Sequence, residues 1–136
     1  MYRDDTTGGI GRRELDVLIV EDEPVSRRAL RALVASRGFL TDAASSGEDA
    51  LRTVARQGLP KIALVDLDLP GMNGIEFIKR LEALNPGVFP VLITAAAGEI
   101  VDDIRRRYPV AYLRKPLDFD RLMVMIDERR EQNEVH

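Results

Sequence analysis

Residues 62–65 form an unbroken apolar run, Ile-Ala-Leu-Val, that ends at Asp66. A strand with apolar side chains at successive positions needs cover on both faces, which the central strand of a parallel sheet receives. Two other apolar runs also end in charged residues: residues 15–20 lead into Glu-Asp-Glu, and residues 110–113 lead into Arg-Lys-Pro. The carboxyl ends of parallel strands meet at one edge of the sheet, where ligands bind in open α/β folds. The sequence therefore predicts a site of acids and a lysine at this edge.

The rest of the chain alternates between short apolar runs and segments whose apolar residues recur at helical spacing. Pro24 suits the first turn of a helix, because proline there loses no hydrogen bond. The expected strands are 15–20, 39–44, 62–65, 88–94 and 110–113, and the expected helices are 24–37, 46–57, 75–84, 99–107 and 119–130. Pro90 is expected near the start of its strand or at an unpaired position. This alternation predicts an α/β fold, a doubly wound parallel sheet of five strands with five helices.

Helical spacing also predicts which helix faces are buried. The positions expected to face inward are Val25, Ala29, Leu30, Leu33 and Val34 in the first helix, Ala50, Leu51, Val54 and Ala55 in the second, Ile75, Ile78, Leu81 and Leu84 in the third, and Ile100, Val101 and Ile104 in the fourth. Each set predicts one face packed on the sheet.

The length of 136 residues suits one domain. Residues 1–14 lack apolar periodicity and predict a mobile leader, residues 15–131 the domain, and residues 132–136 a tail. The net charge of −3 argues against a nucleic-acid partner, which usually leaves a basic footprint. The absence of cysteine excludes disulfides and thiolate metal sites and favours the cytoplasm. No apolar stretch approaches the roughly 20 residues that cross a bilayer, so no membrane association is expected.

The charged residues at the strand ends suggest a particular chemistry. Magnesium prefers oxygen ligands and commonly takes one or two carboxylates with waters and phosphate oxygens, which Glu21, Asp22 and Asp66 can supply. Lys115 adds a compact positive charge for a phosphoryl oxygen. An aspartate can itself attack phosphorus to form an aspartyl phosphate. Any one of these acids alone would more commonly be a helix cap or a solvated loop residue; their combination at strand ends points to a site.

Taken together, these motifs resemble the receiver domains of two-component response regulators, from about residue 15 to residue 128. The segments that carry the resemblance are Val20-Glu-Asp-Glu-Pro24, Val65-Asp-Leu-Asp-Leu-Pro-Gly-Met-Asn-Gly74, Thr94-Ala95 and Lys115-Pro116. The steps of 44, 28 and 21 residues from Asp22 through Asp66 and Thr94 to Lys115 are also similar to those of the family. The resemblance implies a flavodoxin-like sheet with strand order 2-1-3-4-5 and a cis peptide at Lys115-Pro116.

The resemblance also implies roles at the site. Asp66 is expected to accept a phosphoryl group from a histidine kinase or a histidine phosphotransfer protein. Asp22 and Asp66 are expected to bind Mg²⁺ through their carboxylates, and Asp68 through its backbone carbonyl. Glu21, where the family more commonly has aspartate, is expected to act through a bound water. Lys115 is expected to hold a phosphoryl oxygen.

Two further residues are expected to transmit phosphorylation. Thr94 would donate its hydroxyl to the phosphoryl group, and Tyr112 would then turn inward, so the surface formed by the fourth helix, fifth strand and fifth helix changes. The mixed charges of that surface suit an output protein, whose identity the sequence does not reveal, or a second copy of the chain in a homodimer. Tyr108-Pro109-Val110 stands where many family members have Gly-Ala, which alters the connection into the last strand.

Under this interpretation the protein is a signalling domain rather than an enzyme, apart from slow removal of its own phosphate. It is either a stand-alone receiver or one excised from a longer chain. Two alternatives stay open. Asp66-Leu-Asp68 is similar to the Asp-x-Asp signature of haloacid-dehalogenase-type phosphatases, and a degenerate receiver would bind its partner without phosphate.

Overall fold

The fold is a five-stranded parallel sheet flanked by five helices in a computed structural model that describes residues 15–96, 98–108 and 110–134, with side chains up to residue 129. The strands are β1 (Val17–Val20), β2 (Thr41–Ala44), β3 (Ile62–Asp66), β4 (Phe89–Thr94) and β5 (Ala111–Arg114). The helices are α1 (Pro24–Ala35), α2 (Gly47–Gln57), α3 (Gly74–Leu84), α4 (Gly98–Arg107) and α5 (Phe119–Glu134). The strand order β2-β1-β3-β4-β5 confirms the predicted topology.

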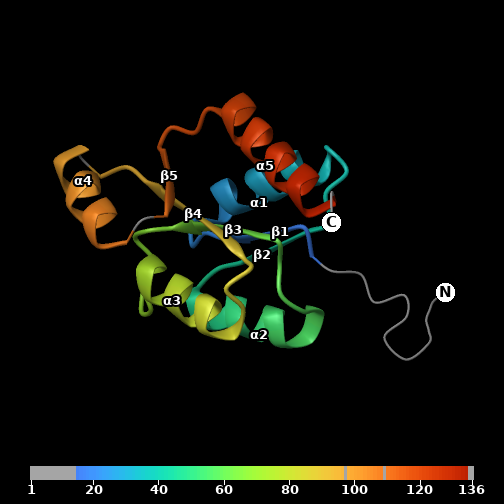
Figure 1. The fold of residues 1–136 in the computed structure, drawn as a ribbon, viewed down its shortest axis with the longest axis horizontal. Helices are drawn as coiled ribbons and strands as arrows, with labels where there is room; N and C mark the ends of the chain where they lie inside the picture. The colour runs from blue at the N-terminus through green and yellow to red at the C-terminus, as the bar shows by residue number, and fades with distance from the viewer. Residues whose placement is uncertain (1–14, 97, 109, 135–136) are drawn as a thin grey trace.

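The elements form three layers (Figure 1). Helices α1 and α5 cover one face of the sheet and α2 and α3 cover the other, while α4 lies at the end of the molecule beyond β5. Side chains alternate between the two faces along each strand: Leu18 and Val20 of β1 join the core under α2 and α3, whereas Val17 and Ile19 join the core under α1 and α5. All five residues of β3 are buried, as the unbroken apolar run predicts for a central strand.

Local sequence signals set several element boundaries. Pro24 occupies the first turn of α1, and the carboxylate of Glu23 caps that helix by accepting a hydrogen bond of 2.8 Å from the Ser26 amide. The hydroxyl of Ser46 caps α2 in the same way, accepting from the Asp49 amide at 3.0 Å. Gly38, three residues after the end of α1, has a φ of 90°, a conformation that glycine adopts without strain.

Pro90 lies inside β4, one residue after its start, at a position where its missing N–H leaves the ladder intact. The amide of Phe89 donates to the carbonyl of Lys61 at 2.9 Å, so the nitrogen of Pro90 faces away from β3. On its other side, pairing with β5 begins only at Val91 and Ala111. The expectation that Pro90 lies near the start of its strand is confirmed.

Several positions expected to face inward are exposed. Val25 and Leu33 are 64% and 46% exposed, and Ala29 between them is exposed as well, while Leu30 and Val34 are the α1 residues that the core buries. Ala55, Leu84 and Ile100 are also exposed. These predictions were wrong because the apolar arc of each helix is wider than the strip that one sheet face can cover.

Some boundaries differ from those expected. β1 and β2 begin two residues later than predicted, although Leu15 and Phe39 before them are buried. Helix α5 continues to Glu134, so residues 132–134 of the expected tail are helical. The expected leader, 1–14, and the final residues 135–136 lie outside the described part of the chain. No described helix is both long and apolar enough to cross a membrane.

Candidate functional site

The three acids predicted from the strand ends meet at one edge of the sheet. Val20 of β1 lies beside Val65 of β3 in the parallel register, so the residues that follow, Glu21 and Asp66, are neighbours. Carboxylate oxygens of Glu21, Asp22 and Asp66 all lie within 4.8 Å of one another. Glu21 and Asp66 are buried and Asp22 is exposed, so the cluster has a closed inner side and an open outer side.

Lys115 reaches this cluster from two strands away. Its amide donates to the carbonyl of Thr94 at 2.8 Å, and the cis peptide to Pro116 follows, as predicted. The side chain crosses the end of β4, and its Nζ lies 2.8 Å from Oδ2 of Asp66 and 3.3 Å from Oε1 of Glu21. The single ammonium therefore pairs with the two buried acids.

Burial and neighbouring charges shift two pKa values in the site. Burial raises the pKa of Glu21, and the charge of Asp66 acts in the same direction against the opposing effects of the Glu23 amide and Lys115. For Lys115, burial by itself lowers the pKa, but the hydrogen bond and charge of Asp66, together with Glu21, outweigh it and raise the pKa. The raised pKa keeps Lys115 a cation. The raised pKa of Glu21 means that burial disfavours its ionised form.

The donor set of this cluster suits a hard divalent cation. Three carboxylates converge, which are the ligands that Mg²⁺ prefers. Among the described residues, Lys115 is the one ammonium that pairs with these carboxylates, so negative charge remains to attract a cation. The carboxylate of Asp68 is outside this cluster and exposed, whereas its amide donates to Oδ1 of Asp66 at 2.9 Å. Its backbone carbonyl as a ligand stays a prediction.

Gly74 allows the loop after β3 to fold closely over the end of that strand. A Cβ atom at this position would stand 2.5 Å from the carbonyl oxygen of Asp66 and 3.0 Å from the Cα of Leu67, both rigid backbone atoms. The amide of Gly74 instead donates to the carbonyl of Leu67 at 3.2 Å. Glycine is therefore required here to start α3 against the strand that carries Asp66.

The two predicted switch residues lie on neighbouring strands. Thr94 is buried at the end of β4, and its hydroxyl accepts a hydrogen bond of 2.9 Å from the Ala96 amide. Tyr112 in β5 is half-buried, and its hydroxyl donates to the carbonyl of Tyr108 at 3.2 Å. The guanidinium of Arg105 in α4 lies 5.4 Å from the centre of the Tyr112 ring. Tyr112 thus links β5 to α4, and its inward turn stays a prediction.

Sequence reasoning missed Arg27, which contacts the acid loop from α1. Its Nη1 donates to the backbone carbonyls of Glu21 and Asp22, both at 3.1 Å. The signal in the sequence was an arginine one turn into the helix that follows the acid pair, but arginines are equally frequent elsewhere on this helix. Only the folded loop distinguishes Arg27 from its neighbours.

An apolar groove of about 310 Å³ opens beside the site. Its lining includes Glu21 and Lys115 of the site together with Leu30, Leu33 and Phe119 of α1 and α5. The exposed stripe of Val25, Ala29 and Leu33 on α1 reaches this groove through Ala29 and Leu33.

Comparison with known proteins agrees with this arrangement. The family model described as the response regulator receiver domain matches residues 17–127. The transcriptional regulatory protein ZraR of Salmonella typhimurium is 34% identical over 119 residues, which are 86% of this chain and 26% of that protein. The transcriptional regulatory protein MalR of Bacillus subtilis is 34% identical over 125 residues, 90% of this chain and 53% of that protein.

Solved structures show the same fold. A response regulator receiver domain protein from Clostridium thermocellum has a TM-score of 0.77 at 20% identity, covering 89% of this chain and 98% of that one. The N-terminal domain of an uncharacterized protein from Wolinella succinogenes has a TM-score of 0.79 at 24% identity, with the same coverage of both chains. The family model, the relatives and the arrangement of acids and lysine lead to one conclusion: this chain belongs to the response regulator receiver domain family.

Proposed function

We propose that this receiver domain accepts a phosphoryl group on Asp66 in the presence of Mg²⁺ and changes its partner binding as a result. The observation that carries the proposal is the set of contacts at Asp66. This buried carboxylate shares its oxygens between the Lys115 ammonium, at 2.8 Å, and the Asp68 amide, at 2.9 Å, with two more acids within 4.8 Å. Such contacts hold the Asp66 carboxylate in one orientation, as a nucleophile needs.

In the proposed transfer, a carboxylate oxygen of Asp66 forms a bond to the phosphorus of a phosphohistidine or of acetyl phosphate. The bond from phosphorus to the leaving nitrogen or oxygen breaks, and its electron pair departs with the leaving group. Lys115 exchanges its contact with Asp66 for one with a phosphoryl oxygen. The Thr94 hydroxyl, which accepts from the Ala96 amide, keeps its own proton available for another phosphoryl oxygen.

Glu21, Asp22 and Asp66 would hold the cation, Glu21 through a water, with the backbone carbonyl of Asp68 completing the expected set. Bound Mg²⁺ supplies positive charge that offsets the charge of the phosphoryl oxygens during transfer. Removal of the phosphoryl group from Asp66 by water would reset the domain slowly. We therefore propose a signalling role and no turnover of external substrates.

Labelling by acetyl phosphate tests this proposal directly. With Mg²⁺, intact mass should rise by one phosphoryl group, and chelation of the metal should prevent the rise. Asp66→Asn should abolish labelling, because the amide lacks the nucleophilic oxygen, whereas Asp68→Asn should still be labelled. Labelling of Asp66→Asn equal to that of the parent would refute the assignment.

Two other outcomes would favour the alternative functions. Steady hydrolysis of a small phosphomonoester such as p-nitrophenyl phosphate would indicate a phosphatase of the Asp-x-Asp type. Failure to bind beryllofluoride or accept phosphate, in a protein that is folded and binds Mg²⁺, would indicate a receiver-like module that works without phosphorylation.

The phosphodonor we propose is a phosphohistidine-bearing kinase or phosphotransfer protein that docks over the groove between α1 and α5. Lys115, which contacts Asp66 at 2.8 Å, is among the residues that line the groove, so a donor seated there would bring its phosphoryl group near Asp66. With a purified histidine kinase that labels the parent, Leu33→Ser should slow transfer from the kinase and leave labelling by phosphoramidate unchanged. Leu84→Ser, an exposed leucine on α3, is the matched control and should affect neither. Slowing of both donors by Leu33→Ser would instead indicate damage to the site.

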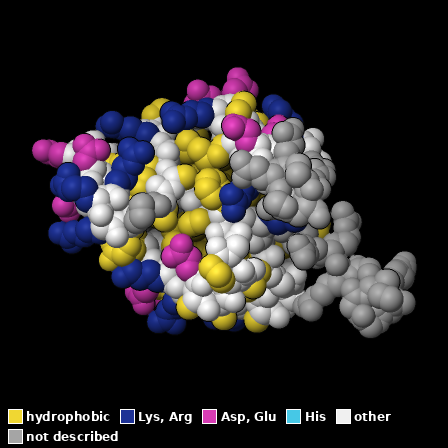
Figure 2. All heavy atoms as spheres, viewed as in Figure 1, with side chains coloured by type: hydrophobic (Ala, Val, Ile, Leu, Met, Phe, Trp, Pro, Cys, Tyr) yellow, Lys and Arg dark blue, Asp and Glu magenta, His cyan; other side chains and the backbone are white. Residues whose placement is uncertain are grey.

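The surface formed by α4, β5 and α5 would bind the output partner. Charges of both signs gather at the α4 end of the molecule (Figure 2), including ion pairs from Asp103 to Arg106 and Arg107 at 3.2 and 3.6 Å. Mixed charges suit an output protein or a second copy of the chain docking with opposite charges facing. Analytical ultracentrifugation with and without beryllofluoride tests the homodimer, because a change in mass should then accompany activation.

A further inference from the structure

We infer that Arg27 is a positioning residue that holds the loop of the acid pair in the form that binds the cation. One guanidinium nitrogen, Nη1, donates to two consecutive backbone carbonyls, those of Glu21 and Asp22, both at 3.1 Å. Arg27 is half-buried, whereas Asp22 beside it is exposed. This inference rests on the proposed Mg²⁺-dependent function and adds to it a residue that contacts neither the cation nor the phosphoryl group.

The acid loop is short and has few other restraints. It consists of residues 21–23 between β1 and α1. The Glu21 amide bonds to the carbonyl of Ala44 at 3.0 Å, and the Glu23 amide bonds to Oε2 of Glu21 at 3.1 Å. Beyond the loop, Pro24 has no N–H to offer. Among the described contacts, those of Arg27 are the ones that fix the direction of the Glu21 and Asp22 carbonyls.

Fixing the two carbonyls also fixes the acids. The peptide group is planar, so the direction of a carbonyl sets the plane from which the next residue departs. When the carbonyls of Glu21 and Asp22 converge on one nitrogen of Arg27, the loop cannot rotate these peptides without breaking both hydrogen bonds. The planar guanidinium presents its donors in fixed directions, which suits this task better than a flexible ammonium.

The charge of Arg27 makes the inference testable, because charge and positioning act in opposite directions. A positive charge beside the acid loop repels an incoming cation, so its removal alone should tighten metal binding. Loss of the loop restraint should weaken metal binding, because the carboxylates would no longer be held in place. Arg28 is the matched control: it is exposed, carries the same charge, and makes no hydrogen bond to this loop among the described residues.

The experiment measures binding of Mg²⁺ by calorimetry, and of Mn²⁺ by electron paramagnetic resonance, with no phosphodonor present. Arg27→Ala should weaken binding about tenfold, at the lower end of the range for residues that support metal ligands. Arg27→Lys, which retains the charge, and Arg27→Gln, which retains an N–H donor, should each lie between Arg27→Ala and the parent. Arg28→Ala should bind as tightly as the parent or slightly tighter.

Two further readouts separate positioning from general damage. Without metal, hydrogen exchange of the amides of residues 21–23 should accelerate in Arg27→Ala and stay unchanged in Arg28→Ala. With acetyl phosphate, the Mg²⁺ concentration for half-maximal labelling of Arg27→Ala should rise about tenfold, while the rate at saturating Mg²⁺ returns toward that of the parent. If Arg27→Ala does not fold, Arg27→Lys and Arg27→Gln carry the same comparison.

The result that would overturn the inference is an Arg27→Ala protein that binds Mg²⁺ as tightly as Arg28→Ala, or more tightly. That outcome would leave the proposed function intact, because the parent would still bind the metal and accept phosphate. A parent protein that binds no Mg²⁺ would instead refute the proposed function and this inference together.

Discussion

Helices α3 and α4 follow neighbouring strands and have similar lengths, 11 and 10 residues, but the sheet holds them very differently. α3 buries four residues, of which Phe77 is completely enclosed. α4 buries none, and its Ile100 is 52% exposed. Burial of apolar surface is the main source of helix stability in a folded domain. The acid site is therefore backed by a firmly anchored helix, whereas the surface beyond β5 carries a weakly anchored one.

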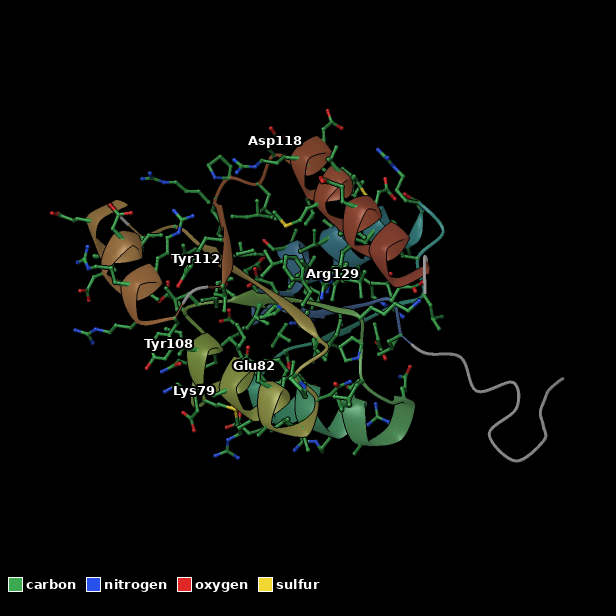
Figure 3. The ribbon with its side chains drawn as sticks, viewed as in Figure 1. Lys79, Glu82, Tyr108, Tyr112, Asp118 and Arg129 are labelled. Atoms are coloured by element: carbon green, nitrogen blue, oxygen red, sulfur yellow. The ribbon has the colours of Figure 1, made fainter. Side chains whose placement is uncertain are left out.

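Besides half-buried Ile104, which packs against the core, polar and aromatic contacts connect α4 to the rest of the protein. Tyr112 donates to the Tyr108 carbonyl, Arg105 lies over the Tyr112 ring, and the Nζ of Lys79 in α3 lies 4.6 Å from the centre of the Tyr108 ring. Figure 3 shows Tyr112, Tyr108 and Lys79 in succession from β5 toward α3. Such contacts contribute roughly 1 kcal/mol or less each, so α4 can change position at small cost. The difference fits the proposed function, in which the phosphoryl group would bind beside α3 and the movement would occur at α4.

The largest effect should come from truncating the anchor of α3. Phe77→Ala removes a fully buried aromatic side chain and should lower the free energy of unfolding by about 3–5 kcal/mol. Ile104→Ala, its counterpart on α4, removes a half-buried side chain and should cost about 1 kcal/mol. Urea denaturation measures both. Equal losses would show that α4 is anchored as firmly as α3.

Hydrogen exchange should show the same contrast in the native protein. Without phosphate, the α4 amides should exchange at least about tenfold faster than those of α3, because opening a helix without buried residues costs less. With beryllofluoride and Mg²⁺, the change should extend from Thr94 to Tyr112 as these residues adopt a second packing. A change confined to residues near Asp66 and the acid pair would show that this receiver does not switch through α4.

In the absence of metal, the buried Glu21 should lower the stability of the domain at neutral pH. Because burial raises its pKa, the folded state binds the Glu21 proton more tightly than the unfolded state does. The stabilisation from binding this proton is fully present below the pKa of Glu21 in the unfolded state, near 4.5. It is lost as the pH rises through the pKa of Glu21 in the folded state. Glu21→Gln should therefore melt higher than the parent at pH 7 and lose this advantage near pH 4.

Glu82→Gln, at an exposed position on α3, is the control for this comparison and should melt with the parent at both pH values. Saturating Mg²⁺ should reduce the advantage of Glu21→Gln, because the parent then gains more from the bound cation. An advantage that is the same at pH 4 and pH 7 would contradict the electrostatic explanation.

The smallest effect should come from the hydroxyl of Tyr112. Tyr112→Phe loses the hydrogen bond to the Tyr108 carbonyl and should lower stability by about 1 kcal/mol or less. Tyr108→Phe retains that carbonyl and serves as the control. The sharper readout is exchange at the end of α4, which should accelerate in Tyr112→Phe and not in Tyr108→Phe. Equal exchange rates in the two variants would show that this hydrogen bond does not help to hold α4.

Much of this protein follows from local patterns in its sequence. The unbroken run at residues 62–65 predicted a buried central strand, and the alternation of runs predicted the five-stranded α/β fold, both of which the structure confirms. Charged residues directly after strands predicted where Glu21, Asp22, Asp66 and Lys115 would gather, and these residues do lie together. These predictions succeeded because strand periodicity and the parallel arrangement leave one edge for all the carboxyl ends.

Tertiary structure alone decided the remaining features. Helical spacing could not reveal that α1 exposes Val25 and Leu33 or that α4 buries no residue, because the area of sheet beneath each helix depends on how the layers pack. Nor could spacing distinguish Arg27 from Arg28. Arg27 differs by two hydrogen bonds to the acid loop, and that loop takes its shape only when β1 and α1 are folded. The sequence determined which residues lie at the edge of the sheet where the strands end. Packing between the layers determined which side chains are buried and how firmly each helix is anchored.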